Sequence, residues 1–258
     1  MLDFSKLKFH HGFNSLSVNQ FTIYSCFQKI YQLPNQNCIG YEALLRATDL
    51  SGNAVSPESI LSDSGSTRQR VQNELKIAVL HLSNFIFYCD KSERSLFINL
   101  SPDAISYLGS CEPLLVAIVK YTDRIANSRK FLMSELNLII EITEEASSNR
   151  SNFSEALTRL QQLGFVFAVD DFGSGCSDLE RVVATSPLIV KLDRTLVWNL
   201  ASSNSDELTQ LINVLKKRGI KILAEGIETL DNFHIAKNLG VDMVQGYYMN
   251  KPVILGPR

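Results

Sequence analysis

Acidic and amide side chains recur along this chain at the ends of short apolar runs. They are Glu42, Asn99, Glu141, Glu144, Asp170, Asp171, Glu225, Glu228 and Gln245. Carboxylates gathered in one place would repel one another and become protonated unless a cation neutralised them. Because the set offers oxygen ligands without His or Cys, it suits a hard ion such as Mg²⁺ or Mn²⁺ rather than zinc.

The pair of adjacent aspartates in this set favours phosphoryl-transfer chemistry. The adjacent Asp170 and Asp171 could reach two ion positions a few ångströms apart, as a two-metal site requires. Lys191 lies inside an apolar run, and we expect its ammonium group to point into the mouth of a barrel. Any one of the acidic residues could instead be a solvated loop residue or a helix N-cap, and Asp193 beside Arg194 could be a surface ion pair.

The elements that position these residues follow from the period of the apolar side chains. Short β-rich runs cover residues 21–31, 39–46, 96–100, 136–143, 165–172, 188–193, 221–227 and 244–249. Helical patterns cover residues 69–89, 154–163, 205–218 and 228–239. Eight strands with intervening helices predict an α/β barrel, for which 258 residues suffice. The strand ends of such a barrel form one rim, so distant acidic residues would meet there.

The first two strands depart from the standard barrel. Only residues 33–37 join them, and this turn is too short for a parallel crossover. We therefore expect the first pair to be antiparallel. The organisation predicted is an N-terminal arm, residues 1–20, followed by a single domain, residues 21–258.

Composition limits the partners. The chain has 25 basic and 27 acidic groups, a formal net charge of -2, and no basic run. Such a balance gives no footprint for nucleic acid or for a membrane surface, so we expect a small-molecule partner. The five cysteines are scattered, with no CxxC pair, which favours a reducing compartment. No stretch reaches the length of a membrane span, and we expect a cytoplasmic protein.

The motifs also resemble those of a known family. Residues 41–46 (YEALLR) resemble the signature of the EAL-domain phosphodiesterases, which act on cyclic di-GMP. The family's later motifs are resembled, in order, by residues 97–102 (FINLSP), 141–144 (EITE), 170–175 (DDFGSG), 191–193 (KLD), 224–228 (AEGIE), 245–247 (QGY) and 251–252 (KP). The resemblance runs from about residue 27 to residue 252.

The resemblance implies a modified TIM (β/α)8 barrel with an antiparallel first strand, and cleavage of cyclic di-GMP to linear pGpG. It assigns Glu42, Asn99, Glu141 and Asp170 to one Mg²⁺ or Mn²⁺ ion. It assigns Asp170, Asp171 and Glu225 to a second ion. Lys191 would orient or activate the attacking water, and Gln245 would position it.

Further roles are implied outside the ion sites. Glu144 would support the loop that follows Asp171, and Arg46 would pair with a substrate phosphate. Gln28, Asp193 and Glu228 would belong to the substrate pocket. Dimerisation through the barrel is common in the family, so a homodimer is expected.

The chain departs from the family pattern at a few positions that concern substrate contacts more than ion binding. These are Lys29, Ala47, Cys176 and the segment 61–67.

Two other functions remain open at this stage. A silent EAL domain could bind cyclic di-GMP and pass the signal to a partner protein. A carbon-acid enzyme could use Lys191 as its base and one Mg²⁺ to hold an enolate. The second alternative requires one ion, whereas the phosphodiesterase requires two.

Overall fold

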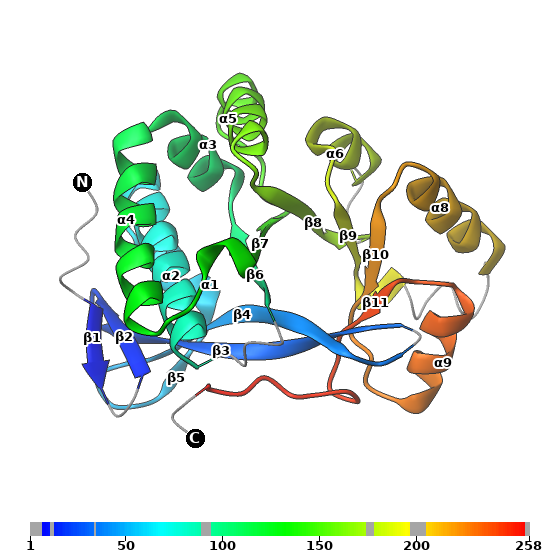
Figure 1. Cartoon of the computed structure of the whole chain (residues 1–258), viewed down its shortest axis with the longest axis horizontal. Coiled ribbons are helices and arrows are strands. Elements are labelled where there is room, and N and C mark those ends of the chain that lie inside the picture. Colours follow the sequence, from blue (N-terminus) through cyan, green and yellow to red (C-terminus); the bar gives the residue numbers. More distant parts are fainter. Residues whose placement is uncertain are drawn as a thin grey trace.

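The chain folds around one closed sheet, shown in Figure 1 from a computed structural model. The structure describes residues 7–10, 13–33, 35–88, 94–173, 178–196 and 205–255. Within these ranges an 11-stranded sheet has the order β1-β2-β3-β11-β10-β9-β8-β7-β6-β4-β5. An additional pairing of β3 with β4 closes strands β3, β4 and β6 to β11 into a barrel.

The strands are β1 (Leu7–His10), β2 (Phe13–Val18), β3 (Phe21–Gln32), β4 (Cys38–Thr48), β5 (Ala54–Val55), β6 (Ser95–Leu100), β7 (Asn137–Ile142), β8 (Val166–Phe172), β9 (Ile189–Leu192), β10 (Lys221–Ala224) and β11 (Met243–Val244). The helices are α1 (Pro57–Ser62), α2 (Thr67–Tyr88), α3 (Pro102–Ser110), α4 (Glu112–Ser128), the 3₁₀ helix η1 (Met133–Glu135), α5 (Arg150–Gln162), α6 (Asp178–Thr185), α8 (Ser205–Lys217) and α9 (Leu230–Asn238). Figure 1 shows the helices in an arc around the outside of the strands.

The strand directions confirm the predicted barrel with an antiparallel first strand. β3 runs antiparallel to β4 and to β11. The neighbouring pairs from β4 through β6 to β11 are parallel. Each strand predicted from residue 21 onward has a counterpart in the barrel, and the four predicted helices correspond to α2, α5, α8 and α9.

Two predicted strands are too long. The strand predicted at 221–227 ends at Ala224, and the one predicted at 244–249 covers only Met243–Val244. Gly226 adopts a φ of 63°, a left-handed conformation that a strand cannot continue. A Cβ atom on Gly246 would lie 2.1 Å from the Ile227 carbonyl oxygen, so only glycine permits the close turn there.

The predicted N-terminal arm contributes strands to the sheet. β1 pairs with β2, and β2 pairs antiparallel with β3. The arm therefore extends the barrel sheet beyond its ring, and the division at residue 20 stays a prediction. No helix in the described ranges is long and apolar enough to cross a membrane.

The barrel interior is plugged by one apolar layer. It consists of Ile30, Phe97, Ile139, Ala168, Ile189, Leu223 and Met243, each from a different strand. Side chains two residues apart lie on the same face of a strand. The residue two positions from each of these apolar residues therefore also points into the barrel. This layer forms the floor on which the polar residues of the mouth rest.

Candidate active site

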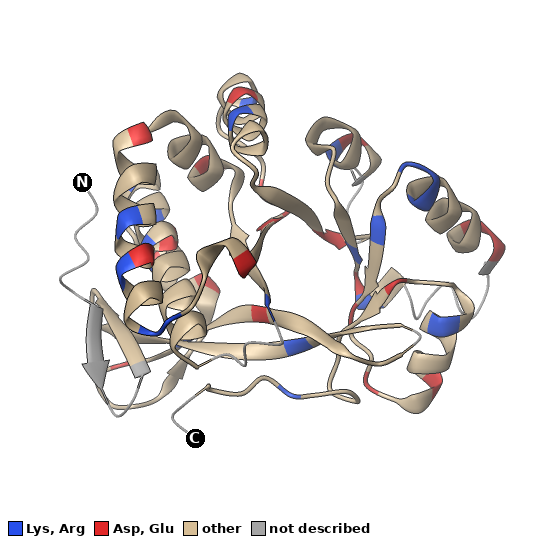
Figure 2. Ribbon diagram, in the orientation of Figure 1, with Lys and Arg blue, Asp and Glu red and all other residues tan. Residues whose placement is uncertain are grey.

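The polar residues of the mouth lie one step above the apolar floor. Each comes two residues from a floor residue; Gln28, Asn99, Glu141, Asp170 and Lys191 lie on the same strand as that residue, and Glu225 and Gln245 directly follow β10 and β11. Glu42 joins them from β4, where it is paired with Gln28. Figure 2 shows acidic residues on several strands around the barrel. The period of the strands therefore converts positions far apart in sequence into a single polar layer.

Lys191 occupies the centre of this layer. Its Nζ lies 2.8 Å from a carboxylate oxygen of Glu141, of Asp170 and of Glu225, and 3.6 Å from Glu42 Oε2. The side chain is 1% exposed. Burial alone would lower the pKa of Lys191, but the surrounding carboxylates raise it well above its ordinary value, so the group is an ammonium ion.

An amide chain continues from Glu42 across the mouth. Asn99 Nδ2 donates to Glu42 Oε1 at 3.1 Å, and Gln245 Nε2 donates to Glu42 Oε2 at 2.6 Å. Gln245 Nε2 also lies 3.3 Å from Gln28 Oε1, and Gln28 Nε2 donates to the Asn250 carbonyl at 3.2 Å. These contacts hold both oxygens of Glu42 in place.

Asp170 and Asp171 both reach the mouth because β8 contains a bulge. The β8–β9 register passes from Val169 opposite Val190 to Phe172 opposite Leu192, so two residues of β8 face Lys191 alone. Asp171 adopts a φ of 51°, in the left-handed region. One oxygen each from Asp170, Asp171 and Glu225 lie within 4.8 Å of one another, close enough to share an ion.

Burial and the repulsion of neighbouring carboxylates raise the pKa values of Glu141, Asp171 and Glu225. The pKa of Glu141 is well above its ordinary value, mainly through burial, with Lys191 opposing the shift. Burial raises the pKa of Glu225 to about 8, and burial together with Asp170 raises that of Asp171 to about 6. One ammonium group therefore does not balance the negative charge of the cluster.

The residues present fit divalent metal ions. Asn99 Oδ1, Glu141 Oε2 and Gln245 Oε1 are buried acceptors without a hydrogen-bond partner among the described residues. Buried acceptors of this kind normally have partners. The carboxylates outnumber the cations around them, and all the donor atoms are oxygens. These acceptors and carboxylates therefore suit a hard ion such as Mg²⁺ or Mn²⁺.

A cleft of about 280 Å³ opens beside the cluster. Its lining is Gln28, Glu42, Asp193, Arg194, Glu225, Gly226, Glu228, Gln245, Gly246 and Tyr247. Three of the predicted substrate residues, Gln28, Asp193 and Glu228, are thus brought to one cleft. Asp193 Oδ1 accepts from the backbone N–H and the hydroxyl of Thr195, so it also shapes the turn after β9.

Other predicted residues lie outside both the carboxylate cluster and this lining. Arg46 lies on β4 beyond Glu42, and its Nη1 donates to the Leu45 carbonyl at 2.7 Å. Glu144 is 41% exposed, and its Oε1 lies 3.8 Å from Arg181 Nη1. The loop that Glu144 was expected to support includes residues 174–177, among them Cys176, and these lie outside the described residues.

Three residues of interest did not emerge from the sequence as site residues. Arg194 and Tyr247 line the cleft, and Arg181 contacts the end of β8. Arg194 directly follows Asp193, and Tyr247 comes two residues after Gln245. Their closeness in sequence to predicted site residues could have indicated both. Arg181 lies on α6 and has no such signal.

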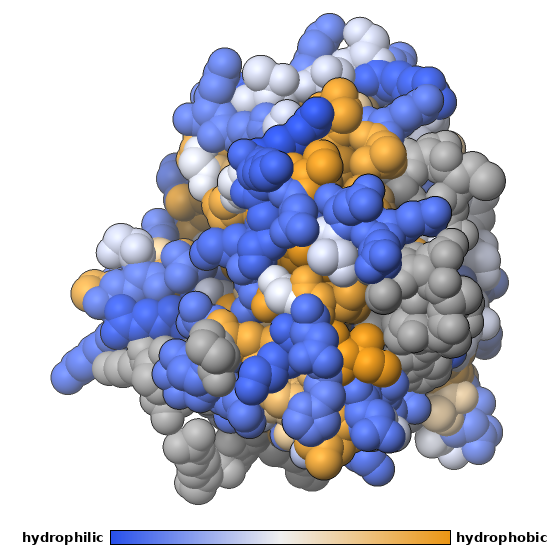
Figure 3. Space-filling model, turned by 90° about the vertical axis from the view of Figure 1, so that its right-hand side faces the viewer, coloured by the Kyte–Doolittle hydropathy of each residue, from blue (hydrophilic) through white to orange (hydrophobic). Residues whose placement is uncertain are grey.

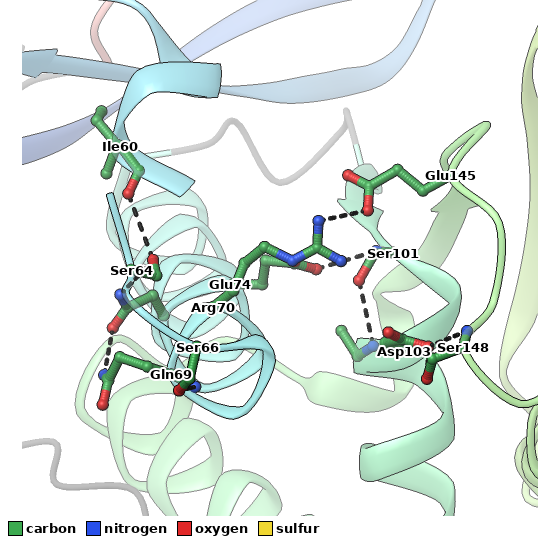
Figure 4. A network of polar contacts seen from close by, with 12 residues as sticks. Ile60, Ser64, Ser66, Gln69, Arg70, Glu74, Ser101, Asp103, Glu145 and Ser148 are labelled. Carbon is green, nitrogen blue, oxygen red and sulfur yellow. Dashed lines mark hydrogen bonds and ion pairs between the residues drawn. The ribbon is translucent and has the colours of Figure 1, made fainter. Parts of the chain in front are cut away.

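A second polar network, drawn in Figure 4, ties α2 to the rim. Arg70 Nη1 lies 2.6 Å from Glu145 Oε2 in the segment after β7. Glu74 Oε2 accepts from the backbone N–H of Ser101 at 3.1 Å, and Ser101 is the N-cap of α3 directly after β6. The start of α2 is therefore bonded to the chain at the ends of two strands that carry the predicted ion ligands.

The arrangement is that of a known family of domains. The family model for the EAL domain matches residues 14–252, nearly the whole of the chain. The chain belongs to the EAL domain family. The order of the motifs and the antiparallel first strand agree with this membership.

Two relatives with similar sequences carry the name cyclic di-GMP phosphodiesterase. The probable cyclic di-GMP phosphodiesterase PdeA of Escherichia coli is 25% identical over 84% of this chain and 29% of its own length. The cyclic di-GMP phosphodiesterase PA2567 of Pseudomonas aeruginosa is 29% identical over 88% of this chain and 38% of its own length. The chain thus spans about a third of the length of these relatives.

Solved structures of EAL proteins share the fold. The Bacillus subtilis YkuI protein, in complex with cyclic di-GMP and calcium, matches 92% of this chain and 57% of its own, with a TM-score of 0.73 and 22% identity. The Klebsiella pneumoniae BlrP1 protein, in complex with manganese and cyclic di-GMP, matches 91% of this chain and 57% of its own, with a TM-score of 0.71 and 22% identity.

Proposed function

We propose that this EAL domain is a metal-dependent phosphodiesterase that hydrolyses cyclic di-GMP to linear pGpG. The observation that carries the proposal is the cluster of Glu42, Glu141, Asp170 and Glu225 around Lys191, with Asp171 beside it. A buried cluster with this excess of negative charge has a strong reason to bind cations. The relatives named for this activity support the choice of substrate.

The ligands of two ions can be proposed from the same cluster. Glu42, Asn99, Glu141 and Asp170 would hold one Mg²⁺ or Mn²⁺ ion, and Asp170, Asp171 and Glu225 would hold the other. When bound, a pair of divalent ions supplies charge neutralisation at the phosphodiester and a readily deprotonated water. The buried, unpaired Asn99 Oδ1 and Glu141 Oε2 support these assignments.

Lys191 and Gln245 would orient the attacking water, Lys191 by donating to its oxygen and Gln245 by accepting one of its O–H groups. Lys191 Nζ lies 2.8 Å from three carboxylate oxygens, which engage its three N–H donors, so it would donate to the water in place of a carboxylate that turns toward an ion. Gln245 Oε1 is buried without a hydrogen-bond partner in the described part of the chain, so it can accept from that water. Nε2 of the same side chain remains bonded to Glu42.

The cleft beside the cluster is proposed to hold the nucleotide. Gln28, Asp193 and Glu228 line it and can bond to base or ribose groups. Arg194 brings a guanidinium to the same cleft, and Tyr247, 55% exposed, offers an aromatic face to a guanine. Arg46, on the same face of β4 as Glu42, is proposed to pair with a substrate phosphate.

Incubating the purified protein with cyclic di-GMP and Mg²⁺ or Mn²⁺, and separating the nucleotides by chromatography, tests the proposal. We expect pGpG to form with metal and not with EDTA. Glu42→Gln should lower kcat by at least about a hundredfold, a loss typical of removing one charge-stabilising group. Glu112→Gln, an exposed glutamate paired with Arg159, is the matched control and should retain activity.

The other outcomes discriminate between the alternatives. Intact cyclic di-GMP that nevertheless binds would contradict hydrolysis and favour a silent receptor. One bound Mn²⁺ per chain, without action on cyclic di-GMP, would favour carbon-acid chemistry. Full activity of Glu42→Gln in metal-defined buffer would show that the ligand assignment is wrong.

The protein is further proposed to form a homodimer through its barrel helices. Leu179 and Val183 lie one turn apart on α6 and are 56% and 63% exposed. Figure 3 faces the α6, α8 and α9 side and shows apolar side chains exposed among polar ones. Contiguous exposed apolar groups mark association surfaces, and we propose the Leu179–Val183 pair as the centre of such a surface. Sedimentation velocity should show a dimer that Val183→Glu dissociates and that Val116→Glu, on α4, leaves intact.

A further inference from the structure

The bulge in β8 is what brings both aspartates to the same side. In a regular strand, neighbours such as Asp170 and Asp171 point to opposite faces of the sheet. Here two residues of β8 face one residue of β9, and the left-handed Asp171 turns its side chain back toward Asp170 and Glu225. A non-glycine residue in this conformation stores backbone strain, so something must hold it.

The hydrogen-bond ladder between β7 and β8 ends just before the bulge, where β7 itself ends. Their parallel pairing ends with Ile142 opposite Val169, just before the bulge. Beyond this point the carbonyl groups of Ile142 and Asp170 need donors from outside the ladder, because buried backbone carbonyls are normally bonded.

A single side chain from α6 supplies both donors. Arg181 Nη2 lies 3.1 Å from the Ile142 carbonyl oxygen and 3.2 Å from the Asp170 carbonyl oxygen. The Asp170 carbonyl belongs to the peptide group that joins Asp170 to Asp171. The orientation of that peptide group sets the φ of Asp171, so the guanidinium acts directly on the strained position.

The second nitrogen of the guanidinium faces Glu144. Arg181 Nη1 lies 3.8 Å from Glu144 Oε1, and the Arg181 side chain is 20% exposed. Glu144 follows Ile142 by two residues on the segment that leaves β7. It is therefore placed to hold the guanidinium against the two carbonyl groups, and its charge is also among the causes that raise the pKa of Asp171.

We propose that Arg181 is a positioning residue that holds the Asp170–Asp171 bulge in its ion-binding geometry, and that Glu144 acts on the site through Arg181. The inference rests on the proposed function, since it concerns the aspartates assigned there to the ions. It gives a physical route, through Arg181, by which the exposed Glu144 would act on the aspartates proposed to bind the ions.

Calorimetric titration of Mn²⁺ into the metal-free protein tests this without relying on turnover. We expect the wild-type protein to bind two ions, and Arg181→Met to weaken one of them by about tenfold to a hundredfold, the range for residues that orient metal ligands. Arg181→Lys, which keeps the positive charge but has a single donating nitrogen, should have an affinity between those of the wild type and Arg181→Met. The loss of kcat in Arg181→Met should be partly restored by excess Mn²⁺, with KM for cyclic di-GMP unchanged.

Arg159→Met is the matched control. Arg159 also bonds a backbone carbonyl, that of Gly109, and a glutamate, Glu112, but it does so away from the mouth. It should bind both ions as the wild type does. The thermal midpoint of each variant separates loss of positioning from loss of folding, and Arg181→Lys keeps the test valid if Arg181→Met does not fold.

A double-mutant cycle tests the path through Glu144. If Glu144 acts through Arg181, then Glu144→Gln adds little further loss of Mn²⁺ affinity to Arg181→Met. Additive losses would overturn that path, and two ions bound to Arg181→Met with wild-type affinity would overturn the positioning role itself. A wild-type protein that binds no Mn²⁺ and cleaves nothing would instead refute the proposed function, and the inference with it.

Discussion

At the residue scale, one ammonium group faces the carboxylates of four residues. Lys191 Nζ lies within 3.6 Å of Glu42, Glu141, Asp170 and Glu225, at a position 1% exposed to solvent. In the metal-free protein this group is the main local compensation for the carboxylates. Bound divalent ions would add further positive charge to neutralise the same carboxylates.

Replacing Lys191 by Met should therefore destabilise the metal-free protein. We expect the free energy of unfolding at pH 8 in EDTA to fall by about 3 kcal/mol or more, because buried carboxylates lose their partner. Mn²⁺ should raise the thermal midpoint of Lys191→Met more than that of the wild type. Lys216→Met, whose exposed ammonium pairs with Asp242, is the control and should change stability by less than about 1 kcal/mol. Equal stability of Lys191→Met and wild type in EDTA would contradict the expectation.

At the element scale, the buried polar side chains of Ser25, His81 and Asn84 join α2 to β2 and β3. Ser25 Oγ of β3 and His81 Nδ1 of α2 are 2.7 Å apart. Asn84 Nδ2, one turn further along α2, donates to Ser25 Oγ and to the Asn14 carbonyl of β2, each at 3.0 Å. Burial lowers the pKa of His81 to about 3. The imidazole is therefore neutral in the folded protein at pH values where an unfolded chain would protonate it.

This difference predicts a loss of stability in acid. The ordinary pKa of His is about 6.5, so between that pH and about pH 3 the unfolded chain binds a proton that the folded protein does not. As pH falls through this window, His81 should lower the free energy of unfolding by up to about 1.4 kcal/mol per pH unit. Urea titrations from pH 7.5 to 4 should show a shallower dependence for His81→Asn, whatever its absolute stability. His234→Asn, exposed on α9, should keep the wild-type slope; parallel slopes for His81→Asn and wild type would refute the account.

At the scale of the whole molecule, the barrel closes through a short seam. β11 pairs with β3 only at Gln32 and Tyr31. Beyond this seam the chain returns, and Val253 pairs with Phe27 of β3 through two backbone hydrogen bonds of 2.7 and 2.9 Å. Figure 1 shows this last segment running along β3. The returning segment thus completes the ladder that β11 leaves unfinished, beside Gln28 of the mouth.

Val253→Pro should weaken this closure. Proline removes the N–H that donates to the buried Phe27 carbonyl, so we expect a loss of about 1–3 kcal/mol in the free energy of unfolding. Val253→Ala keeps both backbone hydrogen bonds and is the control; because the side chain is 42% exposed, its loss should be smaller. Chemical denaturation of the two variants measures the difference. Equal losses would show that the side chain, rather than the backbone pairing, stabilises the seam.

Local patterns in the sequence determined the barrel, its antiparallel first pair and the residues that share its mouth. A two-residue period and a five-residue turn are properties of the chain itself, so they predict which side chains face inward and how the first strands run. The placement of Glu42, Asn99, Glu141, Asp170, Lys191, Glu225 and Gln245 in one layer follows from that period.

The sequence led us to expect Asp170 and Asp171 together at the mouth, but only the tertiary structure shows how Asp171 reaches it. The strand period places Asp171 on the opposite face, and the bulge that reverses this depends on the register of β9 and on a guanidinium from α6. The ends of strands β10 and β11 were also decided by contacts between segments, as at Gly246 against the Ile227 carbonyl. Such contacts join residues by their position in space, which a period along the chain does not encode.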